Sequence, residues 1–371
     1  MTADTGITEI AATIDVRPAG TPPAEDILLD VRDLRTYFNV MDGQVRAVDG
    51  VTFDLPRTGT VGIVGESASG KSVTALTVMR LLDIPPAEIA SGEIWFDGKD
   101  LLALPEDEMR KVRGNDIAMI FQEPLTSLNP VLTIGDQIAE QVRVHMDVTK
   151  QEAWDRAIES IRLVGIPGAE QRVKQYPHEM SGGMRQRVMI GMALSCEPKL
   201  LIADEPTTAL DVTIQAQILE LLKSVQERTK SALMLITHDL GVVAEMVDRV
   251  VVMYAGQVVE QGTVEQVLTQ PTDPYTMGLI ESLPNMDRRG ERLSAIKGVV
   301  PSPFNMPPGC RFAPRCPYAW DQCSATMPDL VPSGAAGQLA RCHLFTPLGA
   351  AKRRELFGSP GGAHIDGARV D

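Results

Sequence analysis

The sequence has no run of apolar residues long enough to cross a membrane. Nothing in its 371 residues approaches the roughly 18 uninterrupted apolar positions that a transmembrane helix needs. The N-terminus carries acids and prolines, but it lacks a basic stretch followed by an apolar core, so it is not predicted to be a secretory signal. We therefore expect the chain to stay in the cytoplasm and to reach a membrane only through another protein.

Basic residues are also in short supply. The chain has 35 Lys and Arg against 49 Asp and Glu, which gives a formal net charge of -14 at pH 7. A nucleic-acid-binding protein needs a basic face, so we expect no nucleic acid among the partners. The same charge argues against electrostatic adhesion to anionic lipid.

No internal repeat is present, and the composition divides the chain into unequal parts. Residues 1–26 are rich in Thr, Ala, Pro and acids, and we expect a disordered lead there. Strand and helix patterns alternate over 27–270, which indicates an α/β core with a parallel sheet. Pro, Cys and Arg become frequent afterwards, which predicts a small appendage over 271–346 and a flexible tail over 347–371.

Four short apolar runs have the character of central parallel strands, which are buried on both faces. They span Thr60–Val64, Ile117–Phe121, Leu200–Ala203 and Ala232–Ile236. Residues 27–55 show short β-type runs, residues from about 130 to 195 have a helical pattern, and Ala255-Gly256 joins two runs predicted to form a hairpin.

A glycine-rich loop follows the first of these strands and precedes a predicted helix. It fits the pattern G-x-x-x-x-G-K-[ST] in full, in a context that argues against a chance Gly/Ser turn. Its backbone N–H groups and the helix N-terminus are suited to phosphate oxygens. Lys71 is expected to neutralise the β- and γ-phosphates of a nucleotide, and the Ser72 hydroxyl to bind Mg²⁺. The predicted binding residues are Gly65, Glu66, Ser67, Ala68, Ser69, Gly70, Lys71 and Ser72.

Two carboxylates, Asp204 and Glu205, end the strand predicted at Leu200–Ala203. Ligands of open α/β sheets bind at this edge, so we expect Asp204 to hold Mg²⁺ and Glu205 to act as general base on the attacking water. Adjacent acids at a strand end are by themselves more often a helix cap or a solvated turn. The glycine-rich loop reverses that balance and predicts a nucleoside triphosphatase.

Four further motifs occur in the order and at roughly the spacing of one family. The segment Met180–Arg187, Met-Ser-Gly-Gly-Met-Arg-Gln-Arg, resembles the ABC signature, usually written LSGGQ. Gln122 matches the Q-loop, Ala209-Leu210-Asp211 the D-loop, and His238 the switch histidine. The chain thus resembles the ATP-hydrolysing subunits of ABC transporters over about residues 27–345.

This resemblance implies a fold and a set of roles. The fold is α/β: a P-loop NTPase core of ABC type with a helical subdomain over about 130–195, an N-terminal antiparallel β subdomain and a small Cys-containing appendage. Gln122 is expected to touch Mg²⁺ and the attacking water, and His238 to contact the γ-phosphate of ATP. Phe38 is expected to stack on adenine, with Tyr37 as the alternative.

The family also implies that each ATP lies between two subunits. The loop Ser181, Gly182 and Gly183 precedes an amphipathic helix, so it offers N–H groups and a helix dipole to an anion. In the family this loop faces the γ-phosphate bound to the opposite subunit. Asp211 of the D-loop is also expected to bind nucleotide.

Several segments resemble one branch of the family, the importers of oligopeptides and dipeptides. They are the Ser-Gly-Gly-Met-Arg-Gln-Arg form of the signature, Phe121–Pro130, the box Pro271–Thr276 with Asp273 where His is common, and the appendage with four cysteines. The resemblance implies an ATPase that drives peptide import across the cytoplasmic membrane, from the cytoplasmic face.

The implied partners are two integral membrane permease subunits, a second ABC ATPase subunit that is a related but different chain, and, indirectly, an extracytoplasmic solute-binding protein. The same role for nickel, glutathione or another solute is the alternative. A soluble ABC ATPase acting on DNA or ribosomes is the alternative from another class. The single ATPase unit and the absence of a coiled-coil insertion or basic surface argue against it.

The cysteines are distributed unevenly. Four lie in one C-terminal region with the spacing x5, x6 and x18, while Cys196 is expected to be a buried small apolar residue. In a reducing cytoplasm such a cluster points to metal before disulfides. The spacing lacks the tight pair of structural zinc sites, and Cys316-Pro317 resembles ferredoxin-type ligands. The family resemblance also implies a [4Fe-4S] cluster in this subunit class. The expected ligands are Cys310, Cys316, Cys323 and Cys342.

We expect that cluster to be structural, because a small appendage has little apolar core of its own. Zn²⁺ and free or disulfide-linked thiols are the alternatives. The glycine-rich loop 65–72, hereafter the phosphate loop, is remote from the appendage in sequence, so nucleotide binding is expected to survive loss of the metal if the appendage is structural.

Overall fold

The structure of the protein is a computed structural model that describes residues 19–122, 127–208, 210–283 and 296–357. Most of the predicted lead over 1–26 and part of the predicted tail over 347–371 lie outside the described residues. Residues 123–126 of the segment after Gln122 and Ala209 of the D-loop lie outside them as well.

The N-terminal part of the chain forms an antiparallel sheet in the order β2-β1-β4-β5. Where the sequence predicts short runs, the structure has two strands of 14 residues that pair along their whole length, with several register shifts. The strands are β1 (Ile27–Val40), β2 (Gly43–Pro56), β4 (Ala87–Phe96) and β5 (Lys99–Asp100).

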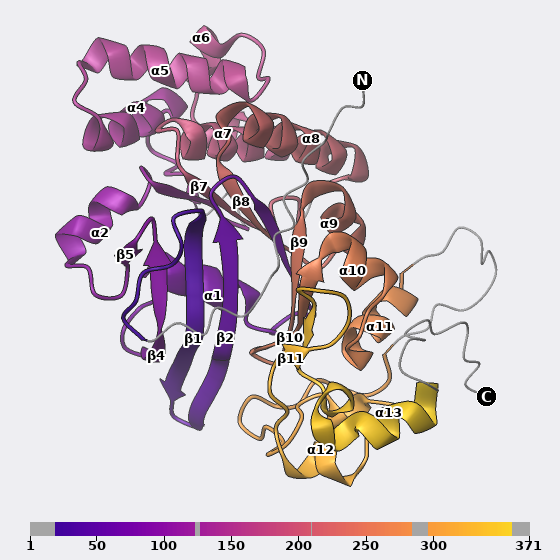
Figure 1. The fold of residues 1–371 in the computed structure, drawn as a ribbon. Coiled ribbons are helices and arrows are strands. Elements are labelled where there is room, and N and C mark those ends of the chain that lie inside the picture. The colour runs from indigo at the N-terminus through magenta and orange to yellow at the C-terminus, as the bar shows by residue number, and fades with distance from the viewer. Residues whose placement is uncertain (1–18, 123–126, 209, 284–295, 358–371) are drawn as a thin grey trace, which may run out of the picture.

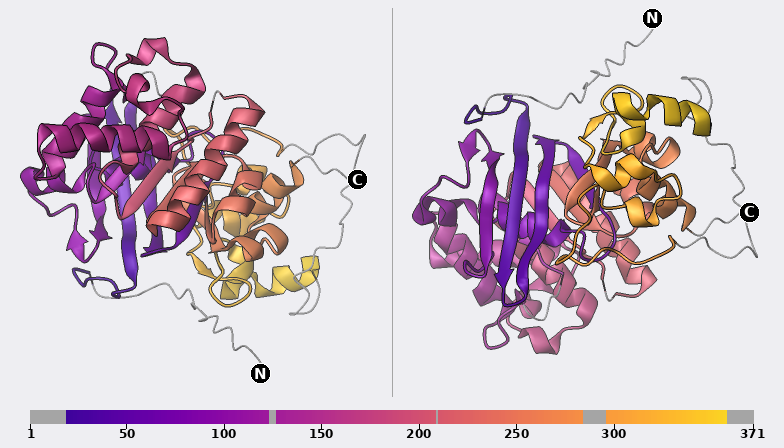
Figure 2. Two further views of the ribbon diagram at one scale, coloured as in Figure 1. Left: turned by 90° about the horizontal axis from the view of Figure 1, so that it is seen from above. Right: turned by 90° about the horizontal axis from the view of Figure 1, so that it is seen from below.

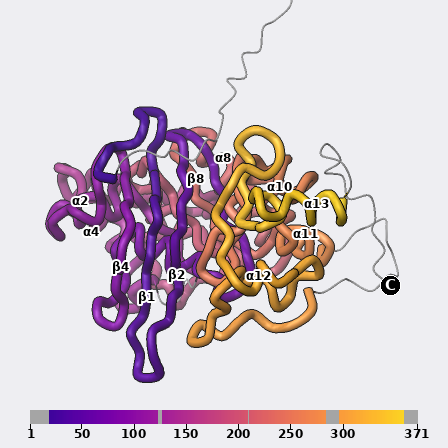
Figure 3. Tube along the Cα trace, turned by 60° about the horizontal axis from the view of Figure 1, so that its bottom comes forward, coloured from indigo at the N-terminus to yellow at the C-terminus, as the bar shows by residue number. Residues whose placement is uncertain are grey.

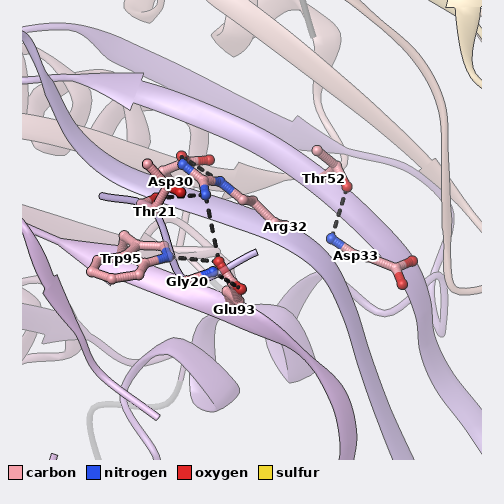
Figure 4. Close-up of polar contacts among 8 residues, drawn as sticks. All are labelled: Gly20, Thr21, Asp30, Arg32, Asp33, Thr52, Glu93 and Trp95. Atoms are coloured by element: carbon pink, nitrogen blue, oxygen red, sulfur yellow. Dashed lines mark hydrogen bonds and ion pairs between the residues drawn. The ribbon is translucent and has the colours of Figure 1, made fainter. Parts of the chain in front are cut away.

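An arginine of this sheet forms hydrogen bonds within β1, to β4 and to the segment that precedes β1 (Figure 4). Arg32 of β1 donates to Asp30 of its own strand and to Glu93 of β4, at 2.6 and 3.4 Å. The backbone N–H of Gly20 donates to Glu93 as well, and the carbonyl of Thr21 accepts from Arg32. Two residues of the predicted lead therefore lie against the sheet.

The second sheet has the order β11-β12-β10-β9-β3-β8-β7-β6, and its strands from β9 to β6 are parallel. The four predicted buried strands are confirmed, each within one residue of its expected bounds. The strands of the second sheet are β3 (Thr60–Val64), β6 (Ile117–Ile120), β7 (Leu200–Asp204), β8 (Ala232–Thr237), β9 (Arg249–Tyr254), β10 (Gln257–Thr263), β11 (Val331–Pro332) and β12 (Leu339–Ala340).

The predicted hairpin joins β9 to β10. Its two central residues, Ala255 and Gly256, have φ of 46° and 84°, the left-handed conformation that tight two-residue turns require.

The parallel strands lie between the antiparallel sheet and a layer of helices (Figure 1). Both of their faces are buried, and side chains along each strand alternate between two cores. In β7, Leu200 and Ile202 pack with residues of the antiparallel sheet and of α1 (Lys71–Val78), whereas Leu201 and Ala203 pack with the helices on the other side. Burying one such aliphatic side chain stabilises the fold by about 1.5–3 kcal/mol. The continuous apolar runs follow from this two-sided burial.

The region predicted to be helical, about 130–195, contains α4 to α7 and is confirmed. Thr133, Thr149 and Ser181 cap α4, α5 and α7 by accepting the backbone N–H of the third helical residue. Gly165 and Gly168 have φ of 72° and 68° and separate α5 from α6, where the sequence predicts a break.

Helices α4 to α9 pack on the face of the second sheet that is turned away from the antiparallel sheet (Figures 1 and 2). Among all the helices of the described ranges, none combines the length and hydropathy that a membrane-crossing helix needs. They are α1 (Lys71–Val78), α2 (Glu106–Val112), α4 (Ile134–His145), α5 (Lys150–Leu163), α6 (Ala169–Arg172), α7 (Gly182–Leu194), α8 (Val212–Thr229), α9 (Leu240–Met246), α10 (Val264–Thr269), α11 (Pro274–Glu281), α12 (Asp321–Ala325) and α13 (Ala350–Phe357).

The C-terminal appendage continues the second sheet and runs beside β2 (Figure 3). Its strand β12 pairs with β10, and the buried carboxylate of Glu260 in β10 binds the segments on either side of it. Glu260 accepts hydrogen bonds from the backbone N–H of Thr272 at 2.8 Å, the N–H of Asp273 at 3.0 Å and the amide of Gln338 at 2.9 Å. The appendage therefore packs against the core around a buried carboxylate whose oxygens are hydrogen-bonded.

Asp273 caps α11 by accepting from the N–H of Tyr275 at 2.8 Å, and it is buried beside Glu260. Burial raises the pKa of Asp273 well above its ordinary value, and the Glu260 charge raises it further. The folded state therefore binds this proton more tightly than the unfolded chain. The stabilisation that this bound proton gives the folded state is fully present below the pKa of Asp273 in the unfolded chain, about 3.9. It is lost as the pH rises through the raised pKa of Asp273 in the folded state.

Replacing Asp273 with Asn should stabilise the fold at pH 8 by about 1 kcal/mol or more, because the amide keeps the cap without a buried charge. The gain should shrink as the pH falls toward 5. Urea unfolding of both proteins across that range measures it, with exposed Asp329→Asn as the control. A gain that is constant with pH would contradict the buried charge as its cause.

Candidate nucleotide-binding site

The glycine-rich loop connects β3 to α1 at the carboxyl edge of the parallel strands. Two of its positions need glycine. Gly65 and Gly70 have φ of 153° and 100°, and a Cβ on either would collide with a carbonyl oxygen, that of Met253 or of Ala47. The loop is therefore held closely between β9 and β2, with its N–H groups at the start of α1.

Lys71 is buried, and its ammonium donates to the carbonyls of Gly65 at 2.8 Å and Glu66 at 3.0 Å. Burial lowers the pKa of Lys71, and the carboxylates of Glu205 and Asp204 act in the opposite direction. The amine thus lies against the loop, where phosphate oxygens could replace the two carbonyls as its acceptors.

The hydroxyl of Ser72 donates to Asp204 at 3.0 Å, which joins the first turn of α1 to the end of β7. Asp204 is buried, and burial raises its pKa. A hydroxyl and a carboxylate in contact are hard oxygen ligands of the kind that Mg²⁺ takes together with nucleotide phosphates and water. These two residues fit such an ion.

Three groups converge on Glu205. Gln122 donates from its amide to one carboxylate oxygen at 3.1 Å, Thr208 donates to the same oxygen at 2.8 Å, and Nδ1 of His238 lies 3.5 Å from the other oxygen. Glu205 also has φ of 45°, an uncommon conformation for a residue with a side chain, of the kind that clusters at functional sites. The structure brings together residues that the sequence places after three different strands.

The predicted signature loop begins α7, and it lies at the surface. Ser181 and Gly182 are exposed, and the Ser181 hydroxyl accepts from the N–H of Met184 at 3.3 Å. Asp211 caps α8 by accepting from the N–H of Ile214 at 3.0 Å. Within the described ranges, no hydrogen bond joins either element to the loop 65–72. The site formed by this chain alone therefore lacks them.

The two candidate aromatic residues of β1 lie on opposite faces, because strand side chains alternate. Tyr37 donates its hydroxyl to Asp49 at 2.8 Å, with Arg46 over its ring. Thr36 is buried and within 3.1 Å of the Thr77 hydroxyl in α1. Phe38 is half-buried, and strand alternation predicts that it shares the face of Thr36.

Two residues of the appendage reach the phosphate loop, although the two segments are far apart in the sequence. Arg315 binds the Glu66 carboxylate, and the Tyr275 hydroxyl accepts from the Glu66 N–H. Sequence reasoning missed both residues. The only signal was the box Pro271–Thr276, which contains Tyr275 but says nothing about its partner.

The four cysteines of the appendage line one cavity of about 20 Å³. All are free thiols, and burial raises the pKa of Cys310 to about 11 and that of Cys316 to about 12. The thiol form of these two cysteines is therefore favoured over the thiolate.

Among the residues that the structure describes, no three His, Cys, Asp or Glu side chains are placed to hold a metal ion. The expected [4Fe-4S] cluster on Cys310, Cys316, Cys323 and Cys342 is therefore wrong, and the same finding removes the Zn²⁺ alternative. Closeness in sequence brought the thiols to one cavity without a ligand geometry. Cys196 is buried, as predicted.

Comparison with known proteins places this site in a family. Residues 48–208 match the family described as ABC transporter, and residues 259–323 match the one described as oligopeptide/dipeptide transporter, C-terminal region. The chain is 54% identical over 323 residues to the oligopeptide transport ATP-binding protein AppD of Bacillus subtilis, covering 87% of this chain and 98% of that protein. It is 52% identical to the dipeptide transport ATP-binding protein DppD of the same organism, over 81% and 90% of the two chains.

Solved structures agree with the fold. The dimeric ATP-binding cassette MJ0796 in a post-hydrolysis state with ADP and Pi matches with a TM-score of 0.58 and 26% identity, over 64% of this chain and 99% of that one. The cbiO1 protein of Clostridium perfringens matches with a TM-score of 0.55 and 29% identity, over 66% and 91%. The predicted fold class is confirmed. This chain belongs to the ATP-binding subunits of ABC transporters, in the branch that carries the oligopeptide/dipeptide transporter C-terminal region.

Proposed function

We propose that this chain hydrolyses ATP to drive an importer of oligopeptides or dipeptides across the cytoplasmic membrane. The convergence of Gln122, Thr208 and His238 on Glu205, beside the phosphate loop, supports the hydrolytic role. The cargo is supported by the match of residues 259–323 and by relatives whose names refer to oligopeptide and dipeptide transport.

The loop residues hold the triphosphate in this proposal. Backbone N–H groups from Gly65 to Ser72 and the Lys71 ammonium bind the β- and γ-phosphates, because together they offer donors and positive charge at one place. Ser72, Asp204 and Gln122 are the residues that would hold Mg²⁺, which would neutralise phosphate charge. Phe38 stacks on adenine from the face of β1 that is turned toward α1.

Glu205 is the proposed general base. A water attacks the γ-phosphorus, its proton passes to the Glu205 carboxylate, and the bond to the β-phosphate oxygen breaks to leave ADP and phosphate. Gln122 holds the carboxylate from one side. His238, whose Nδ1 lies 3.5 Å from Glu205, donates to a γ-phosphate oxygen in this proposal. The exposed His238 side chain is free to turn toward a nucleotide.

The exposed signature and D-loop residues indicate a second subunit. Ser181, Gly182 and Gly183 offer a helix N-terminus to an anion, yet this chain does not place them at its own phosphate loop. In the proposed complex they complete the site of a facing ATPase, together with Asp211. ATP binding then closes the two subunits on each other.

ABC importer subunits of this kind work with membrane permeases and a second ATPase. We propose two permease subunits, a related but different ATPase chain, and a solute-binding protein on the outer side that delivers the peptide. The chain would lie on the cytoplasmic face of the membrane, held there by the permeases.

Replacing Lys71 with Ala should remove nucleotide binding, because it deletes the positive charge of the loop. Replacing Glu205 with Gln should preserve binding and lower turnover by about 10²–10⁴-fold, since an amide cannot accept the proton of water. Binding of MgATP and phosphate release by the assembled complex measure the two effects. Wild-type turnover by Glu205→Gln would disprove its role as the base.

Co-purification from the native membrane should recover this chain once, with one related ATPase and two permeases. The isolated chain should hydrolyse ATP slowly, because its site lacks the facing signature loop. Mass spectrometry of the intact complex gives the subunit count. Recovery of this ATPase twice, and no other, would refute the mixed pair.

The reconstituted importer should accumulate a labelled tripeptide in proteoliposomes when ATP is on the side of this subunit. The Glu205→Gln complex should bind ATP and transport nothing, which is the matched control. Uptake of Ni²⁺ or glutathione with no uptake of di- or oligopeptides would overturn the proposed cargo and leave the ATPase assignment intact.

A further inference from the structure

The phosphate loop carries a negative charge that opposes its function. Glu66 directly follows Gly65, and its carboxylate is near enough to Lys71 to act on that ammonium. A carboxylate in a loop that binds a polyanion repels the ligand and competes for the cation that should neutralise it. Its charge must therefore be balanced from elsewhere in the structure.

The balancing group comes from the appendage. Both terminal nitrogens of Arg315 donate to the Glu66 carboxylate, at 2.7 and 3.0 Å, in the paired geometry that makes such contacts strong. The Arg315 side chain is 4% exposed and that of Glu66 is 29% exposed, so solvent screens this pair less than a surface pair. The pair joins positions 249 residues apart in the sequence.

Arg315 is itself held rigidly. Its guanidinium lies over the rings of Tyr254 and Phe312, at 5.7 and 5.9 Å, and donates to the Tyr254 hydroxyl at 3.3 Å. The Lys297 carbonyl accepts from its Nε at 3.2 Å. These contacts fix one orientation of the fork toward Glu66.

A second contact fixes the loop backbone at the same residue. The N–H of Glu66 donates to the Tyr275 hydroxyl at 2.9 Å. The Tyr275 ring packs against Tyr254 and Phe312, with centroids 4.6 and 5.4 Å apart. Both halves of Glu66, side chain and backbone, are thus held by one cluster of aromatic residues and arginine.

We propose that Arg315 is a positioning residue of the nucleotide site: it neutralises Glu66 and orients the start of the phosphate loop, so that nucleotide affinity depends on the docked appendage. Arg315 does not touch the nucleotide in this arrangement. Its loss exposes the Glu66 charge to the phosphates and to Lys71. The inference uses the proposed role of residues 65–72, and binding of MgADP by the wild-type chain tests that role separately.

The test compares MgADP affinity in the full chain and its variants, because ADP carries the β-phosphate and needs no facing subunit. Arg315→Ala should weaken binding roughly tenfold, the effect of losing a charge-assisted hydrogen-bonded pair. Arg315→Lys keeps the positive charge but lacks the paired donors of the guanidinium. Its affinity for MgADP should therefore lie between that of the wild type and that of Arg315→Ala. Arg353→Ala is the matched control, because this arginine of α13 lies over the ring of Phe345 and not at the phosphate loop.

The double variant Glu66→Gln/Arg315→Ala decides between positioning and folding. If Arg315 acts by neutralising Glu66, the double variant should bind MgADP several-fold more tightly than Arg315→Ala alone, because the unbalanced charge is gone. A double variant as weak as Arg315→Ala would overturn the proposal, as would wild-type affinity in Arg315→Ala. Thermal unfolding identifies folded variants, and Arg315→Gln replaces Arg315→Ala throughout if the latter does not fold.

Discussion

The carboxyl edge of the parallel sheet is the constraint from which the rest of this site follows. Parallel strands end at the same edge, so whatever follows each strand is gathered there. The phosphate loop follows β3, Asp204 ends β7, Gln122 comes after β6 and His238 after β8. Spatial order in the sheet therefore brings together groups from segments far apart in the sequence, and Glu205 receives contacts from two of them.

Burial of both faces of the parallel strands fixes the register of the strands that end at this edge. Along β7 alternate side chains enter different cores, and a slip of one residue would exchange the two faces. The hydrogen bond between Ser72 and Asp204 depends on this register, because it joins the end of β7 to the helix that follows β3. The packing of the apolar core and the geometry of the polar site therefore depend on the same strand register.

The buried strands and the grouping of the site residues could be predicted from the sequence, because strand periodicity and ordered motifs determine them. Both ends of Thr60–Val64 are predicted correctly, because the buried run ends at Gly65. The grouping of Lys71, Asp204 and Glu205 follows from strand topology. The two long N-terminal strands were less visible, since their polar outer faces interrupt the apolar pattern. The metal expectation failed because spacing along a chain carries no information about how side chains are oriented.

The contact between Arg315 and Glu66 could not be predicted, because neither residue type marks its partner and the fold alone brings them together. The appendage docks around charges that are costly without it: Glu260 is buried and satisfied by appendage donors, and Glu66 is balanced by Arg315. Undocking would leave both carboxylates without these partners. Because Glu66 belongs to the phosphate loop, the position of the appendage and the electrostatics of the nucleotide site cannot change independently.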